Sequence, residues 1–194
     1  MKRAKLIAFA GLDGSGKSTQ IKAVKLFLEA SGYKVKIQQH FSLPIGKKCK
    51  EIIEDSEDAY IRAFAFAIDE YAQKTDNIYD GDYDVILCDR SHYCAYAYAQ
   101  AQGLCGIWIN ELYKHSQKYD ICIYLDISLP TFYARKGLDG ISPNLSETQL
   151  VKVRDTYLDL VKLGELIMID GEQNFETVTE EIKVMVCEVL SKCN

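Results

Sequence analysis

Arginine is scarce in this chain of 194 residues. The 23 basic residues comprise 18 lysines and only five arginines, which are Arg3, Arg62, Arg90, Arg135 and Arg154. Against 28 acidic residues they leave a net charge of −5. The chain therefore lacks the basic excess with which nucleic-acid-binding proteins neutralise phosphates, and we expect no nucleic-acid polymer as a partner.

Long apolar runs and paired cysteine motifs are also missing. No stretch approaches the roughly 18 apolar residues that a membrane span needs, and the apolar run at residues 6–10 is too short for the core of a signal peptide. The seven cysteines form no CxxC pair and no cysteine–histidine pattern with zinc-ligand spacing, which favours reduced thiols. These absences predict a cytoplasmic protein without a membrane partner.

The patterns that are present predict one α/β domain over residues 1–194. The length suits a single domain. Short apolar runs indicate buried strands near residues 5–10, 84–88, 121–125 and 166–169, and alternation of apolar and polar residues indicates another strand at 33–38. Helical periodicity occupies residues 17–31, 45–55, 57–75, 91–102, 106–118, 129–136, 147–163 and 174–191. Strands separated by helices indicate a three-layer α/β/α sandwich with a five-stranded parallel sheet and helices on both faces. A segment rich in glycine, serine and asparagine predicts a short lid at about 136–149.

A phosphate-binding motif follows the first predicted strand. The nine residues match GxxxxGK[ST] at each fixed position, and they are Gly11, Leu12, Asp13, Gly14, Ser15, Gly16, Lys17, Ser18 and Thr19. Glycines let the backbone N–H groups point at phosphate oxygens, and the next helix adds its positive N-terminal end. In this motif the lysine reaches the β- and γ-phosphates and the serine hydroxyl binds Mg²⁺. We therefore expect this segment to bind ATP, Lys17 to act in catalysis and Ser18 to bind the metal.

Charged residues follow the third predicted strand and flank the predicted lid. Asp89 can hold Mg²⁺ and Arg90 can bind phosphate oxygens through two N–H groups, or the two can form a salt bridge that only ends the strand. Arg135 and Arg154, on either side of the lid, can bring a guanidinium to a transferring phosphoryl group. For either of these arginines a solvated helix face is the structural alternative.

Six segments in fixed order carry a family resemblance. They are FAGLDGSGKSTQIK, FAIDEYAQ, VILCDRSHYCAYAYAQAQG, YDICIYLDISLPTFYARK, VRDTYLDL and IMIDGEQNFETVTEEI. Together they resemble the thymidylate kinase type of P-loop nucleoside monophosphate kinase. The resemblance implies a P-loop NTPase fold, ATP-dependent phosphorylation of a (deoxy)nucleoside monophosphate in nucleotide biosynthesis, Mg²⁺ as cofactor and a homodimer. The crowded apolar side chains of the predicted helix at 57–75 are compatible with such a dimer interface.

The resemblance also implies roles for individual side chains. Asp13 would bind the sugar of the acceptor and help to place the donor phosphates, and Arg90 would hold the acceptor phosphate. Asp89 would support Mg²⁺. Phe66 would stack on the base, and Tyr98 would pack under the sugar. Catalysis would then depend on Asp13 and Arg90 together with Lys17 and Arg135.

Three positions depart from the pattern that the family usually shows. One is Ser91, which follows Asp89 and Arg90 where the family usually has tyrosine or histidine. His40 is the nearest match to an arginine that grips the acceptor phosphate, and Glu70 replaces an arginine that bonds the base. A carboxylate accepts hydrogen bonds, whereas a guanidinium only donates them. Glu70 would therefore bind a different edge of the base from the one that an arginine binds. We expect His40 and Glu70 to bind substrate. The loss of two cations weakens the case for thymidine monophosphate as the acceptor.

Two alternative functions stay open on the sequence. A deoxynucleoside kinase would phosphorylate a sugar hydroxyl, which benefits from a general base. Such enzymes usually carry a glutamate after the second strand, where this chain has Gln38, Gln39 and His40. A nucleotide-binding protein with weak catalysis is the second alternative, because cations have been replaced near the acceptor.

Overall fold

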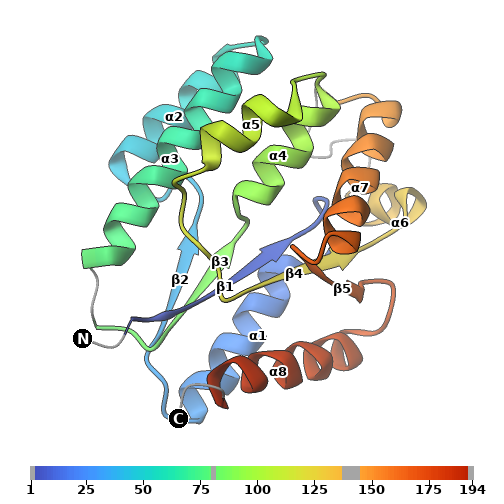
Figure 1. The fold of residues 1–194 in the computed structure, drawn as a ribbon. Coiled ribbons are helices and arrows are strands. Elements are labelled where there is room, and N and C mark those ends of the chain that lie inside the picture. The colour runs from blue at the N-terminus through green and yellow to red at the C-terminus, as the bar shows by residue number, and fades with distance from the viewer. Residues whose placement is uncertain (1–2, 80–81, 137–144, 192–194) are drawn as a thin grey trace.

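The computed structural model describes residues 3–79, 82–136 and 145–191. Its strands are β1 (Lys5–Ala10), β2 (Val35–Gln39), β3 (Val85–Asp89), β4 (Ile121–Asp126) and β5 (Ile167–Asp170). They pair in parallel in the order β2-β3-β1-β4-β5 (Figure 1). The five-stranded parallel sheet is thus confirmed, with each strand close to its predicted position.

Eight helices connect and follow these strands in the described residues. They are α1 (Lys17–Ala30), α2 (Pro44–Asp55), α3 (Ala59–Tyr79), α4 (His92–Ala101), α5 (Gly106–Tyr113), α6 (Leu129–Lys136), α7 (Glu147–Lys162) and α8 (Phe175–Ser191). The prediction of α5 to residue 118 was wrong. The chain leaves the helix after Tyr113 because the side chains of Ser116 and Gln117 bond to His92 and Asn77 instead of continuing a helical face.

Helices cover both faces of the sheet, as the alternating pattern predicts. Ile7 and Phe9 of β1 are fully buried in the core formed with α1 and α8. Ala8 and Ala10 of the same strand face the opposite core, formed with α4 and α7. Figure 1 shows α1 and α8 side by side below the sheet, with α4 and α7 on its other side. These two cores hold the strand ends in fixed positions.

The connections after β1 and β3 leave the sheet toward opposite faces. β1 pairs with β3 along its length, yet β1 continues into α1 on one face while β3 continues into α4 on the other. In open parallel sheets such a divergence creates a crevice at the carboxyl ends of the strands, where ligands bind. The structure therefore places the predicted phosphate loop and Asp89 at this crevice.

Two further observations concern the membrane and lid predictions. Among the described residues, every helix falls short of the length or the apolar character that a bilayer span requires. The predicted lid at about 136–149 falls mainly on residues 137–144, which lie outside the described residues.

Candidate active site

A cleft of about 890 Å³ opens at the carboxyl ends of β1, β2 and β3. Most of the predicted site residues lie on its wall, namely Asp13, Gly14, Gly16, Lys17, Ser18, Thr19, His40, Phe66, Asp89, Arg90, Tyr98 and Arg135. These residues come from α1, α3, α4, α6 and the loops after the three strands. The fold thus brings together side chains that are up to 122 positions apart (135 − 13).

The loop after β1 has a backbone that only glycine allows at its start. Gly11 has φ +143°, and a Cβ there would stand 2.7 Å from the carbonyl oxygen of Leu125. Gly14 and Gly16 also have positive φ, a conformation that costs residues with a Cβ about 1–2 kcal/mol. Leu12 and Ser15 are buried inside the loop. The motif therefore folds into a curled loop that ends at the N-terminus of α1.

Lys17 is folded back onto this loop. Its Nζ donates to the carbonyl oxygens of Gly11 at 3.0 Å and Leu12 at 2.8 Å. Burial and, to a smaller extent, the neighbouring Arg90 lower the pKa of Lys17 to about 8. An anionic phosphate in the cleft would favour the charged lysine, so this side chain is poised to respond to a nucleotide.

Arg90 is fixed beside the phosphate loop by its backbone and by a carboxylate. It has φ +87°, an uncommon conformation for a residue with a Cβ, and its backbone N–H donates to the carbonyl of Phe9 at 3.0 Å. Its guanidinium pairs with the carboxylate of buried Asp13. Nearby, burial raises the pKa of Tyr98 to about 12, so its hydroxyl stays protonated. The two predicted acceptor residues Asp13 and Arg90 thus form one unit.

Ser18 and Asp89 supply hard oxygen ligands at the mouth of the loop. The hydroxyl of Ser18 donates to Oδ2 of Asp89 at 2.7 Å. A hydroxyl and a carboxylate side by side, next to a phosphate loop, are the donor set that Mg²⁺ takes together with substrate phosphates. The residues present therefore fit the predicted metal.

Aromatic rings form the other end of the cleft. Phe41 and Phe66 pack with their ring centroids 5.3 Å apart, and His40 meets the edge of Phe66 at 6.2 Å. All three line the cleft. A flat, apolar surface of this kind suits a nucleobase, because offset or edge contacts with a second ring are favourable.

Glu70 and Arg154 do not lie on the wall of the cleft. Glu70 does not line the cleft: its side chain is 1% exposed and accepts a hydrogen bond from the hydroxyl of Tyr119 at 2.8 Å. Arg154 also lies away from the cleft wall, because both ends of its guanidinium bond to Asp126 at 2.7 and 2.8 Å. In both cases a buried or half-buried partner, which sequence spacing does not reveal, holds the side chain.

Arg135 lies beside the phosphate loop. Its guanidinium donates to the carbonyl oxygens of Gly14 at 3.3 Å and of Gly171 at 3.1 Å. These bonds hold the guanidinium of the exposed Arg135 against the phosphate loop. Its helix, α6, precedes the predicted lid.

The sequence interpretation missed two residues at the aromatic end. Phe41 lies in the loop after β2 with φ +62°, a feature that its sequence context does not show. Asp69 is 0% exposed and accepts hydrogen bonds from His40, Phe41 and Gln73. The signal for Asp69 was available: an acidic pair inside the apolar run of α3 requires buried partners.

Comparison with known proteins shows the family of this chain. The family model described as thymidylate kinase matches residues 9–182. The chain belongs to the thymidylate kinase family. It is 30% identical over 190 residues to a probable thymidylate kinase of Staphylothermus marinus, covering 95% of each chain. It is 29% identical over 194 residues to that of Sulfurisphaera tokodaii, covering 98% of this chain and 99% of the relative.

Membership of the thymidylate kinase family and the site geometry agree on the reaction class. A probable thymidylate kinase of Methanosphaera stadtmanae is also 30% identical, over 95% of this chain and 98% of its own length. The chain is an ATP-dependent nucleoside monophosphate kinase with the P-loop α/β fold of this family. The matched residues 9–182 include the phosphate loop, the aromatic end and the helices that frame the cleft.

Proposed function

We propose that this enzyme transfers the γ-phosphoryl group of ATP·Mg²⁺ to the phosphate of a pyrimidine deoxynucleoside monophosphate, with thymidine monophosphate as the first candidate. The backbone N–H groups of the loop after β1, together with Lys17, would bind the donor phosphates. Ser18 and Asp89 would hold Mg²⁺, which would neutralise charge on those phosphates. The transfer needs no covalent intermediate on the protein, since positioned charges are sufficient.

The observation that carries this proposal is the Asp13–Arg90 pair in the cleft. Asp13 belongs to the phosphate loop after β1 and Arg90 follows β3, and both line the cleft together with Phe66. A nucleotide whose base stacks on Phe66 would bring its phosphate toward Arg90 and its sugar toward Asp13 and Tyr98. Arg135 would then stabilise charge on the transferring group.

A product assay tests the proposal. The protein is incubated with ATP·Mg²⁺ and each of a panel of nucleosides and nucleoside monophosphates, and the products are read out by mass. We expect diphosphates from one or more deoxynucleoside monophosphates and no product from nucleosides. Phosphorylation of a nucleoside hydroxyl in place of the monophosphates would refute the proposal, and so would full turnover by Lys17→Ala.

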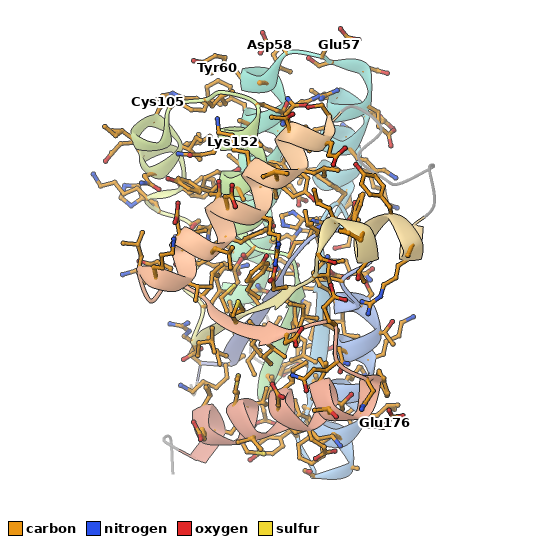
Figure 2. The ribbon with its side chains drawn as sticks, turned by 90° about the vertical axis from the view of Figure 1, so that its right-hand side faces the viewer. Glu57, Asp58, Tyr60, Cys105, Lys152 and Glu176 are labelled. Carbon is orange, nitrogen blue, oxygen red and sulfur yellow. The ribbon has the colours of Figure 1, made fainter. Side chains whose placement is uncertain are left out.

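We also propose a homodimer through the outer face of α3 and α5. Tyr60 and Phe64 of α3 are 51% and 49% exposed, and both pack against Trp108 of α5, with ring centroids 5.1 and 5.4 Å apart. In Figure 2, Tyr60 and Cys105 lie at the same end of the molecule. Exposed aromatic clusters of this kind favour association with another protein surface.

The described cysteines are unpaired, which supports a cytoplasmic location.

A further inference from the structure

Arg62 of α3 is a half-buried cation on the wall of the cleft. The other four arginines are bonded to other parts of the fold, Arg90 and Arg135 to the phosphate loop and Arg3 and Arg154 to residues at the two ends of β4. Arg62 is therefore the arginine that the aromatic end of the cleft has to itself.

The turn between α2 and α3 fixes the stem of Arg62 and leaves its outer nitrogens unbonded. Its Nε donates to the carbonyl oxygen of Ser56, the residue after α2, at 2.5 Å. In the part of the chain that the structure describes, its two Nη groups have no bonded partner, because the acidic side chain of Glu54 on the same cleft wall pairs with Lys50 at 3.6 Å. The guanidinium therefore presents N–H donors to the cleft, where a half-buried donor needs an acceptor.

Arg62 lies well outside the level of the sheet. Gln73 marks that level, because its Nε2 donates to the carbonyl oxygen of Gln39, the last residue of β2, at 3.2 Å. Arg62 precedes Gln73 by 11 residues of α3 (73 − 62), which is about 16 Å along the axis of a helix. Figure 2 shows Asp58, whose carbonyl oxygen accepts from the backbone N–H of Arg62, at the end of the molecule away from the sheet.

Phe66 lies between Arg62 and the level of the sheet. Arg62 and Phe66 are four residues apart on α3, so their side chains are neighbours on one helix face, and both line the cleft. A planar ligand stacked on Phe66 would therefore have one edge within reach of the guanidinium.

The base is the only part of an acceptor nucleotide that can meet a donor this far from the phosphate loop. The acceptor phosphate has to approach the donor phosphates beside Lys17, and the sugar follows it toward Tyr98. In a pyrimidine nucleotide the 4-substituent lies across the ring from the nitrogen that carries the sugar, so it is the outermost group. In thymine and uracil this substituent is a carbonyl oxygen, which accepts hydrogen bonds, whereas in cytosine it is an amino group.

We propose that Arg62 determines base specificity by donating to the 4-carbonyl oxygen of a thymine or uracil base stacked on Phe66. The inference rests on the proposed function and specifies the base of its acceptor. With cytosine both groups would be donors, and the guanidinium would lose its acceptor, so the amino base is disfavoured. Glu70 of the same helix does not take part, since its side chain is 1% exposed and lies off the cleft wall.

Calorimetric binding of three monophosphates to the protein tests this contact. They are thymidine monophosphate, deoxycytidine monophosphate and the monophosphate of 2-pyrimidinone deoxyriboside, which has no substituent at position 4. In the wild type we expect the Kd of the second and third to be about tenfold higher than that of the first, the loss that one hydrogen bond to a charged group represents. Equal affinity for thymidine monophosphate and the 2-pyrimidinone analogue would overturn the proposal, and this comparison does not require any variant to fold.

Arg62 variants complete the cycle with the ligand series. In Arg62→Ala all three monophosphates should bind with the same weak affinity. Arg62→Gln should also abolish the preference for thymine over cytosine, because an amide can both donate and accept. If the preference for thymidine monophosphate over the 2-pyrimidinone analogue persists in Arg62→Ala, another group binds the oxygen and the proposal is wrong.

Lys50→Ala is the matched control, because it removes a second cation from the same cleft wall. It should leave the base preference unchanged, and an equal loss of preference in this variant would show an effect of net charge and contradict the assignment to Arg62. If Arg62 only stabilised the turn through Ser56, Arg62→Ala would lower the melting temperature and weaken the three monophosphates by the same factor, which also contradicts it.

Turnover with ATP·Mg²⁺ separates this inference from the proposed function. At saturating ATP, Arg62→Ala should raise the KM for thymidine monophosphate about tenfold with little change in kcat, since the contact is made equally in the ground state and the transition state. Turnover without any preference among the bases would refute the role of Arg62 and leave the proposed function standing. Binding with the expected preference but no turnover would refute the proposed function and leave the contact standing, and failure of every monophosphate to bind would refute both.

Discussion

Gly46 of α2 lies directly against the Asp69 carboxylate. A Cβ at this position would stand 2.3 Å from Oδ1 of Asp69 and 2.8 Å from Cα of Phe41, where ordinary contacts begin at 3.4 Å. In Gly46→Ala one of these groups must therefore move by about 1 Å (3.4 − 2.3). Space alone decides the sign of the effect, because alanine in a helix is otherwise about 1 kcal/mol more favourable than glycine.

The cost follows from what Asp69 holds. Its carboxylate accepts hydrogen bonds from His40, Phe41 and Gln73, and a hydrogen bond to a charged group contributes about 1.5–3 kcal/mol. Overpacking adds about 1–3 kcal/mol. If the shift breaks one such bond and the gain in helix propensity is subtracted, we expect the free energy of unfolding to fall by about 1.5–5 kcal/mol.

Urea denaturation measures this difference. With a slope of about 2 kcal/mol/M, the midpoint of Gly46→Ala should fall by about 0.8–2.5 M. Gly106→Ala is the matched control, since its Cβ would also meet an atom at 2.3 Å, but that atom is the end of the flexible Gln100 side chain. We expect this control to stay close to the wild type. A Gly46→Ala protein as stable as the wild type, or a control equally destabilised, would refute the reasoning.

Three further changes have defined outcomes. Because burial lowers the pKa of Lys17 to about 8 and bound phosphates raise it, ATP binding at pH 9 should take up about one proton; calorimetry in buffers of different ionisation enthalpy checks this, and zero uptake contradicts it. Arg135→Ala should lower kcat about 100-fold with little change in the acceptor KM, and an unchanged kcat excludes a catalytic role. Phe64→Glu should give a monomer in light scattering while Leu163→Glu, at a 74% exposed position after α7, stays dimeric; a dimeric Phe64→Glu protein would refute the interface.

The phosphate loop shows what local sequence can predict. Its glycines, lysine and serine all lie within residues 11–18, and the conformation depends on φ values that glycine alone adopts easily. Gly11, Gly14 and Gly16 have positive φ as such a loop requires. The same locality explains why the strands were found, since buried parallel strands are short apolar runs.

The ends of helices and the partners of buried charges were harder to predict. The end of α5 depends on bonds from Ser116 and Gln117 to residues of α4 and α3, which no local pattern encodes. The positions of Glu70 and Arg154 depend likewise on Tyr119 and Asp126. A charged side chain takes the partner that the packed elements bring to it.

The sequence by itself determined the sheet class, the family and the nucleotide loop, because these are carried by periodicity and by contiguous motifs. Only the tertiary structure decided how His40 is held. Asp69 and Glu70 lie some thirty positions from it in the chain, and the packing of α3 against the end of β2 places their carboxylates beside its two nitrogens. The physical reason is that a carboxylate taken out of solvent needs partners, and these come from whichever elements pack against it.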